Sequence, residues 1–191
     1  TGSAFAAIRE DGSVVTWGNA TDGGDSSSVA SLIDGDTNSE DVVQVYATTS
    51  AFAAIRKNGS VISWGDTDNG GNTTDVASSV NGTIDVVQIF STNNAFAALR
   101  SDGSVVTWGD KDKGGDSSAV ASDLNGTDKV TKIYATNNAF AALTENGKVV
   151  TWGYGSYGGD SSSVTSLIDG SLDDDVLSVD AKITDGNLAL V

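Results

Sequence analysis

The chain has 191 residues, of which 38% are hydrophobic, and carries a formal net charge of -16 from 26 acidic and 10 basic side chains. This length and hydrophobic content are sufficient for a folded domain with a packed core. The acidic balance argues against nucleic acid as a partner, because phosphate backbones favour clustered Lys and Arg. No apolar run reaches the roughly 18 residues that a membrane-spanning helix needs, so we expect no membrane insertion. Cys and His are absent, which excludes disulfides, thiolate or imidazole metal ligands and the usual nucleophile-base pairs, and we therefore do not expect an enzyme.

The chain opens on a predicted β-hairpin, "AFAAIREDGSVVTWG", which begins at Ala4. "AFAAI" and "SVVTWG" have strand character, and the Asp-Gly pair between them supplies the positive φ angles of a tight turn. Close copies begin at Ala51, Ala95 and Ala139. This repetition, with a Trp-Gly pair roughly every 45 residues, indicates a repeat architecture.

A turn-rich segment follows each Trp-Gly pair, "NATDGGDSSSVASLI" in the first copy and "DKDKGGDSSAVASDL" in the third. The paired Gly favours a chain reversal, and Asp25 or Asp116, each followed by Ser, is a candidate cap for a helical turn. We expect at most about one or two turns of helix there, since Ser and Asp favour caps over helix interiors.

A third strand completes each unit. "VVQVYATTS" begins at Val42 and is echoed from Val86, from Val130 and, weakly, from Val176. The sequence therefore predicts an all-β, propeller-like repeat array of four three-stranded units, with an open superhelical β-array as the alternative. We expect one repeat domain over 1–191, with units at about 4–50, 51–94, 95–138 and 139–184 and a partial fifth unit at 185–191.

The repeat resembles that of a known family. Lined up from Val42, its aliphatic positions, Asn-Gly turn and Trp-Gly pair are similar to the V-x-x-I-A-A-G-x-x-H-T-L-A-L-x-x-D-G-x-V-x-x-W-G repeat of the regulator-of-chromosome-condensation family. The unit length is nearer to that of the related bacterial β-lactamase-inhibiting propellers. The resemblance implies a β-propeller, commonly of seven blades, whereas four Trp-Gly units are present here. Where the family has Gly after its first strand, this chain has Thr48, Thr92 and Thr136.

The recurring aromatic residues are interpreted as packing residues. A Phe among Ala side chains suits a sheet that stacks closely on its neighbour, and each Trp ends an alternating strand whose Val or Ile shares its face. An aromatic binding ring formed by the four Trp is the alternative. The residues predicted to be structural are Phe5, Trp17, Phe52, Trp64, Phe96, Trp108, Phe140 and Trp152.

The loops after Trp-Gly vary between copies while the framework stays constant, which is typical of scaffolds that carry recognition. The candidate binding residues are Asn19, Asp22, Asp66, Asp68, Asp110, Asp112, Tyr154 and Tyr157. Loop acids such as Asp66 and Asp68 also suggest calcium. Their pattern does not repeat from copy to copy, so solvated turn residues are the preferred interpretation, and no cofactor is expected.

We interpret the chain as a non-catalytic scaffold of a secreted or cell-surface bacterial protein, with protein or glycan as its partner and a role in recognition, adhesion or extracellular assembly. Its acidic, Cys-free composition resembles that of large exported bacterial proteins. Two alternatives remain open. One is a lectin-like or inhibitor-like propeller whose contact is formed by Tyr154 and Tyr157. The other is a subunit of an extracellular filament or layer that self-associates by end-to-end pairing of terminal strands.

Overall fold

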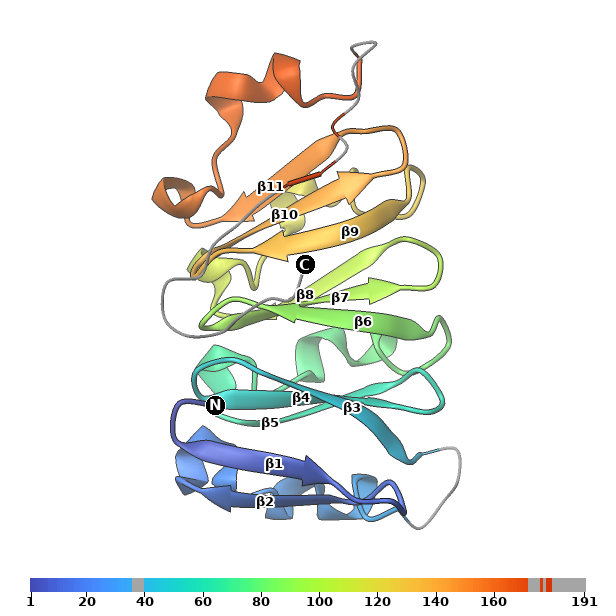
Figure 1. The fold of residues 1–191 in the computed structure, drawn as a ribbon, viewed down its shortest axis with the longest axis vertical. Coiled ribbons are helices and arrows are strands. Elements are labelled where there is room, and N and C mark those ends of the chain that lie inside the picture. The colour runs from blue at the N-terminus through green and yellow to red at the C-terminus, as the bar shows by residue number, and fades with distance from the viewer. Residues whose placement is uncertain (36–39, 172–175, 177, 180–191) are drawn as a thin grey trace.

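The computed structural model describes residues 1–35, 40–171, 176 and 178–179. Within these residues the chain forms four antiparallel sheets that lie one above another along the longest axis of the molecule (Figure 1). The first sheet has two strands and each of the next three has three. The strands are β1 (Ala4–Ile8), β2 (Val14–Gly18), β3 (Val42–Ala47), β4 (Ala51–Arg56), β5 (Val61–Gly65), β6 (Val86–Ser91), β7 (Ala95–Arg100), β8 (Val105–Gly109), β9 (Val130–Ala135), β10 (Ala139–Thr144) and β11 (Val149–Gly153).

Each sequence repeat forms the predicted hairpin. In β4 and β5, Phe52 lies opposite Trp64 and Ile55 lies opposite Val61, and the other three hairpins keep the same register. The turn residue Gly59 has a φ of 74°, a left-handed conformation that glycine adopts readily and other residues disfavour. The repeated Asn-Gly or Asp-Gly turn therefore sets the register that places each Phe beside its Trp.

The remaining strand of each three-stranded sheet comes from the segment before the hairpin. β3 pairs with β4 on the side away from β5, and β6 and β9 pair in the same way with β7 and β10. Each three-stranded sheet therefore begins with the last strand of one predicted repeat unit and continues with the hairpin of the next, because the predicted units start at the hairpin.

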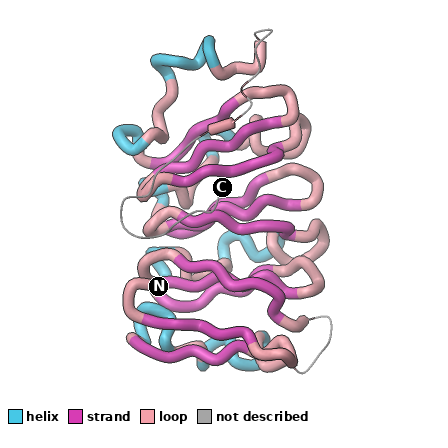
Figure 2. Tube along the Cα trace, viewed as in Figure 1, coloured by secondary structure: helices cyan, strands magenta, loops and turns pink. Residues whose placement is uncertain are grey.

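Short helical segments connect one sheet to the next. The four that follow Trp-Gly directly lie near the left side of the stack in Figure 2. The segments are η1 (Ala20–Gly24), η2 (Ser27–Leu32), η3 (Thr67–Asn69), η4 (Thr74–Ser79), η5 (Lys111–Lys113), η6 (Ser118–Val120), η7 (Gly155–Tyr157) and η8 (Ser162–Leu167). In the described part of the chain, no helix is long and apolar enough to cross a membrane.

The hydrophobic core is formed by the side chains that pack between successive sheets. In β4, the side chains of Ala51, Ala53 and Ala54 are completely buried. Such small residues let neighbouring sheets approach closely, and the Phe and Trp of each hairpin fill the volume that remains. Three clusters of this kind occupy the three spaces between the four sheets.

The predicted all-β, propeller-like array is confirmed. Within the described residues the stack is open, with the first and last sheets at opposite ends of the molecule (Figure 1). The first sheet differs from the expected three strands in having two, β1 and β2. The predicted partial unit at 185–191, and most of the strand expected from Val176, lie outside the described residues.

Candidate interaction surface

Successive sheets are held together by the same contact at each of the three spaces between them. The indole Nε1 of a Trp donates to the backbone oxygen of a Gly in the loop of the preceding sheet, at 3.0 Å for Trp64 and Gly23, 3.0 Å for Trp108 and Gly70, and 3.1 Å for Trp152 and Gly114. The neighbouring Phe covers the same Gly, because a Cβ on Gly70 would lie 2.6 Å from Cδ2 of Phe96. We call this contact between Phe, Trp and the preceding Gly the sheet joint.

The aromatic residues predicted to be structural stack in pairs across each hairpin. The ring centroids of Phe96 and Trp108 are 5.2 Å apart, and the other three pairs are 5.3 Å apart. In the second, third and fourth hairpins these side chains are at most 4% exposed. Phe5 and Trp17 are instead 64% and 51% exposed, because no described sheet covers the outer face of β1 and β2. The packing role that the sequence suggested for this first pair is therefore not seen.

In each of the three three-stranded sheets, a Thr directly after the first strand ties the hairpin to the loop that follows it. Thr48 Oγ1 accepts a hydrogen bond from Ala51 N at 3.0 Å and donates one to Asn69 O at 3.0 Å. Thr92 and Thr136 make the same two bonds. The position at which the resembling family has Gly thus fixes the loop after Trp-Gly in this chain.

Four equivalent loops follow the four Trp-Gly pairs, and we call residues 19–24, 66–71, 110–115 and 154–159 the loop row. Three of them begin with a side chain that caps the turn. Asn19 Oδ1 accepts from Thr21 N at 2.9 Å, and Asp66 and Asp110 accept in the same way from the amides two residues later. Tyr154 occupies this position in the fourth loop and makes no capping bond there. The loops therefore share a backbone shape and differ in side chains.

The candidate binding residues all lie on the loop row but do not converge on one point. Asp68 and Asp112 are exposed, and Asp22 is partly buried. Asp110, besides capping its turn, pairs with Lys113 at 3.2 Å between Oδ2 and Nζ. Tyr154 and Tyr157 are about half exposed and meet edge to face with ring centroids 5.7 Å apart.

Two acids of the loop row, Asp66 and Asp110, hold turns, and Asp25, Asp116 and Asp160 do the same directly after the row. Among the described residues, no group of three or more His, Cys, Asp or Glu side chains is placed to hold a metal ion, whereas calcium needs about six or more converging oxygens. The backbone amide and hydroxyl of Ser118 lower the pKa of Asp116, whose Oδ1 accepts from Ser118 N at 2.8 Å. The pKa values of Asp25 and Asp160 are lowered in the same way by Ser27 and Ser162. The carboxylates thus accept from the first amide of each short helical segment, as expected of a cap at Asp25 and Asp116, but they do so from the position before the N-cap residue, which is a Ser in each case.

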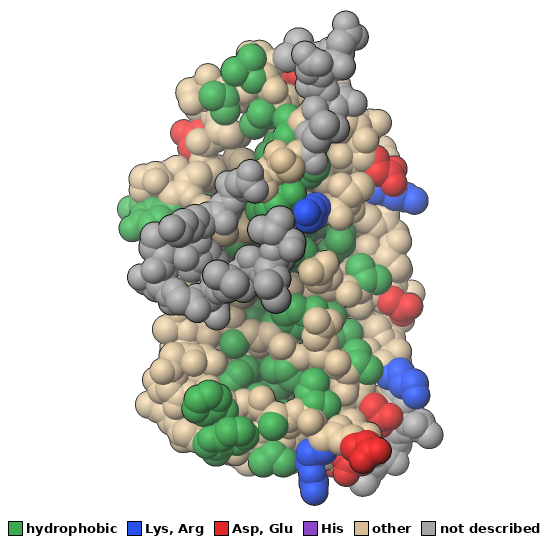
Figure 3. All heavy atoms as spheres, in the orientation of Figure 1, with side chains coloured by type: hydrophobic (Ala, Val, Ile, Leu, Met, Phe, Trp, Pro, Cys, Tyr) green, Lys and Arg blue, Asp and Glu red, His purple; other side chains and the backbone are tan. Residues whose placement is uncertain are grey.

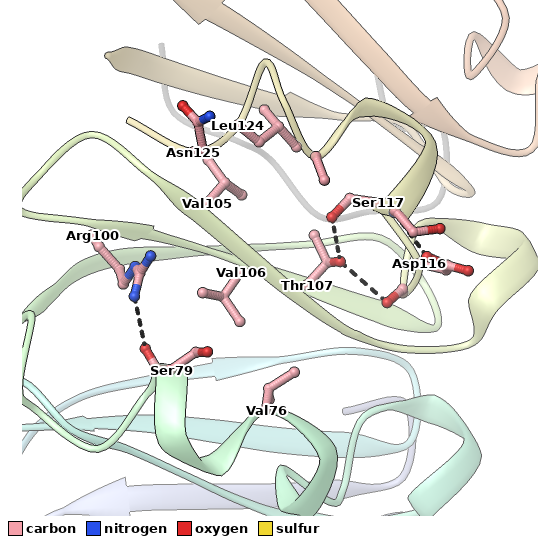
Figure 4. Close-up of a pocket in the computed structure, with 13 residues that line it drawn as sticks. Val76, Ser79, Arg100, Val105, Val106, Thr107, Asp116, Ser117, Leu124 and Asn125 are labelled. Atoms are coloured by element: carbon pink, nitrogen blue, oxygen red, sulfur yellow. Dashed lines mark hydrogen bonds between the residues drawn. The ribbon is translucent and has the colours of Figure 1, made fainter. Parts of the chain in front are cut away.

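A cavity of about 360 Å³ opens between the second and third units, where η4 faces β8 (Figure 4). Val76 and Thr107 line it from opposite sides. Arg100 at its rim donates to Ser79 O at 3.5 Å, and Thr107 Oγ1 donates to Ser117 Oγ at 3.0 Å. The Arg100–Ser79 bond thus joins the two units, whereas the Thr107–Ser117 bond lies within the third unit.

A second cavity of about 340 Å³ adjoins the loop row itself. Its lining includes Thr67 and Lys111 from two successive loops, together with Asp75 and Asp116. The surface along the loop row is therefore hollowed between the second and third units, where it presents both acidic and basic side chains.

An exposed apolar face was not anticipated from the sequence. Phe5, Val15 and Trp17 lie on one face of β1 and β2 and are each about half exposed or more. Figure 3 shows hydrophobic side chains gathered at this lower end of the stack. The sequence did contain an indication of this face. It has four Phe-Trp pairs, and a stack of four sheets has only three spaces between sheets, so one pair must lie on an outer face.

Comparison with known proteins identifies one repeat directly. Residues 130–158, which contain β9, β10, β11 and η7, match the family described as the regulator of chromosome condensation (RCC1) repeat. No curated protein matches the chain in sequence.

Several solved structures share the fold. Prp20p from Saccharomyces cerevisiae, described with its binding properties to Gsp1p and histones, has a TM-score of 0.55 at 23% identity over 80% of this chain and 42% of its own. Yeast RCC1 (Prp20) with bound Kap60 has a TM-score of 0.50 at 20% identity, over 80% of this chain and 42% of its own. Human WBSCR16 has a TM-score of 0.48 at 21% identity, over 79% and 45%. The chain thus spans less than half the length of each neighbour.

The matched repeat has the same three strands and the same sheet joint as the second and third units of the chain. Residues 130–158 therefore match an RCC1 repeat, and the chain as a whole shares the fold of RCC1-type structures.

Proposed function

We propose that this chain is a non-catalytic scaffold whose loop row binds a partner protein. It would work within a secreted or cell-surface bacterial protein, in adhesion or extracellular assembly. The observation that carries the proposal is the loop row, in which four loops of one backbone shape display different side chains on a rigid frame.

The side chains change in charge and size from one loop to the next. The third loop carries two acidic and two basic residues over 110–113, whereas the fourth carries none and presents Tyr154 and Tyr157. Tyr is enriched at protein interfaces, where its ring buries a large area and its hydroxyl keeps a hydrogen bond. The joints and Thr ties hold the loops before binding, which lowers the entropy lost on association.

A protein partner is favoured over a glycan because the loop row extends over four units and its charged side chains differ from loop to loop. The first loop has one Asp, the second has two Asp, the third has two Asp and two Lys, and the fourth has no charged residue. The yeast proteins of similar fold are described with protein partners, namely Gsp1p, histones and Kap60. An extracellular setting is supported by composition, since the net charge of -16 and the absence of Cys resemble large exported proteins.

The test is quantitative cross-linking of the immobilised chain to surface and secreted proteins of its source. The test variant is Asp68→Lys with Asp112→Lys, which inverts charge on two exposed loop positions in the middle of the stack. We expect capture of the partner to fall at least about tenfold, because the charge of the contact surface is reversed.

Val87→Lys is the matched control, because Val87 is exposed on β6 and lies outside the loop row. It should capture the same partner as the unaltered chain. Full capture by the double loop variant would contradict the proposal. Binding to a glycan array without protein capture would favour the lectin-like alternative instead.

A further inference from the structure

The sheet joint has two halves, contributed by consecutive units. The sheet half is the face of a sheet that carries the aromatic pair and a β-branched residue, such as Phe96, Val106 and Trp108. The loop half is the Gly and the following Val of the preceding unit, such as Gly70 and Val76. Both halves meet in one apolar cluster, and the Trp108–Gly70 hydrogen bond crosses it.

One end of the stack presents a sheet half without its loop half. The exposed fractions of Phe5, Val15 and Trp17 are 64%, 46% and 51%, whereas those of the equivalent Phe52, Ile62 and Trp64 are 4%, 5% and 1%. The rings of Phe5 and Trp17 are nevertheless stacked at 5.3 Å, the same distance as in the buried second pair. The two rings are therefore already arranged as they are in a completed joint.

The other end presents a loop half without its sheet half. Gly158 has a φ of 100°, close to the 97° of Gly70, but a Cβ on Gly158 would meet nothing within 4 Å. Val164 is 41% exposed, whereas the equivalent Val76 and Val120 are packed against the next sheet.

A ladder of backbone hydrogen bonds also runs along the stack and stops at both ends. Gly2 N donates to Thr49 O at 2.7 Å, Thr49 N to Asn93 O at 2.9 Å, and Asn93 N to Asn137 O at 2.9 Å. Within the described residues, Gly2 O and Asn137 N have no partner. One end thus offers an acceptor and the other a donor at equivalent positions.

We propose that two copies of this chain stack head to tail, with the sheet half of one copy closed on the loop half of the other. Trp17 Nε1 of one copy then donates to Gly158 O of its neighbour, and Asn137 N of that neighbour donates to Gly2 O. A second copy is the occupant that fits, because the two exposed surfaces are the two halves of a contact that the chain already forms three times.

The contact joins two different surfaces, so repeated stacking either closes a ring or extends a filament. It is made by sheet faces and loops, and it does not require the pairing of terminal strands. Burial of Phe5, Val15 and Trp17 supplies the apolar area that favours association.

The experiment uses two variants of the full chain, each of which disables one half. Trp17→Glu places a charge in the sheet half, and Gly158→Ala with Val164→Glu blocks the loop half. Sedimentation velocity over a dilution series, in about 0.15 M salt to screen the like charges, should show reversible self-association of the unaltered chain. Each variant should raise the dissociation constant at least about tenfold.

Mixing the two variants separates head-to-tail stacking from other modes of pairing. The Trp17→Glu chain keeps its loop half and the double variant keeps its sheet half. An equimolar mixture should therefore form a complex of one copy of each, although neither variant associates alone. The substituted side chains are exposed, and circular dichroism verifies that both variants fold.

Val87→Glu is the control, because Val87 is exposed on β6 away from both ends. It should self-associate as the unaltered chain does. The proposal is overturned by an unaltered chain that stays monomeric throughout the series, by a loop-half variant that still self-associates, or by a mixture that forms no complex.

Discussion

Individual residues of the repeat have effects that depend on their place in the stack. Gly70 and Gly158 occupy equivalent positions with nearly equal φ angles, 97° and 100°. Phe96 lies against Gly70, whereas nothing lies within 4 Å of a Cβ on Gly158. Both positions therefore favour Gly because of their backbone conformation, but only at Gly70 is a side chain also excluded by packing.

We predict that Gly70→Ala destabilises the chain more than Gly158→Ala. Both substitutions strain a left-handed backbone to a similar extent, but only Gly70→Ala forces a methyl group to within 2.6 Å of Phe96 Cδ2. Overpacking of this kind adds about 1–3 kcal/mol. The difference is measured by urea unfolding, with Trp17→Glu as the background so that stacking between copies does not contribute. Equal losses in the two variants would show that the Phe ring moves aside.

The short helical segments depend on side-chain caps that titrate. Asp25, Asp116 and Asp160 each accept a hydrogen bond from the amide two residues later, and their pKa values are lowered mainly by that bond. The second unit has Asn72 at the equivalent position, and Asn72 Oδ1 makes the same bond to Thr74 N at 2.8 Å. One unit therefore keeps its cap without a titrating group.

A pH dependence follows from these lowered pKa values. A carboxyl whose pKa is lower in the folded chain stabilises it above the unfolded pKa of about 3.9, and this contribution is lost as the pH falls through the folded pKa. We predict that the triple variant Asp25→Asn, Asp116→Asn, Asp160→Asn loses less thermal stability than the unaltered chain between about pH 5 and about pH 3. Thermal melts followed by circular dichroism test this. Parallel losses in the two chains would contradict a role for the charged caps.

At the scale of the whole molecule, each sheet contacts only its neighbours in the stack. A sheet inside the stack is covered on both faces, whereas the sheet of β1 and β2 is covered on one. In repeat proteins of this kind, stability is roughly a sum of units and the contacts between them. The first sheet is therefore expected to open at lower free energy than the sheet of β6, β7 and β8.

Hydrogen exchange tests this expectation. In the Trp17→Glu chain, the amides of β1 and β2 should exchange faster than those of β7 and β8, because local opening there breaks one joint instead of two. In the unaltered chain at high concentration, stacking should slow exchange in β1 and β2 and leave β7 unchanged. Uniform exchange across all four sheets would show that the stack opens as one cooperative unit.

Much of the fold was predictable because its signals are local. The Asn58-Gly59 turn and the alternation in the two strands beside it define a hairpin within about 15 residues of sequence. The caps at Asp25 and Asp116 involve residues two apart. From the sequence, Thr48 was noted only because the regulator-of-chromosome-condensation repeat has Gly at that position. Its role requires Asn69, which lies on a loop beyond the whole hairpin, to fold back against it.

The candidate binding residues all lie on the loop row, as their sequence positions after Trp-Gly imply, but how these loops sit relative to one another was not predictable. The variable segments after Trp-Gly pointed to the loop row, since each segment is contiguous in sequence. The cavity lined by Thr67 and Lys111 depends on how two successive units pack against each other. No local sequence pattern specifies the spacing between those units.

The sequence by itself determined the repeat, the hairpins, their register and the caps, because turns, strand alternation and capping act between near neighbours along the chain. Only the tertiary structure decided which copies of the repeat are buried. Phe5 and Phe52 stand in the identical segment "AFAAI", yet they are 64% and 4% exposed. The difference arises because burial depends on whether another unit lies against that face, and the sequence of the strand contains no information about its neighbour in space.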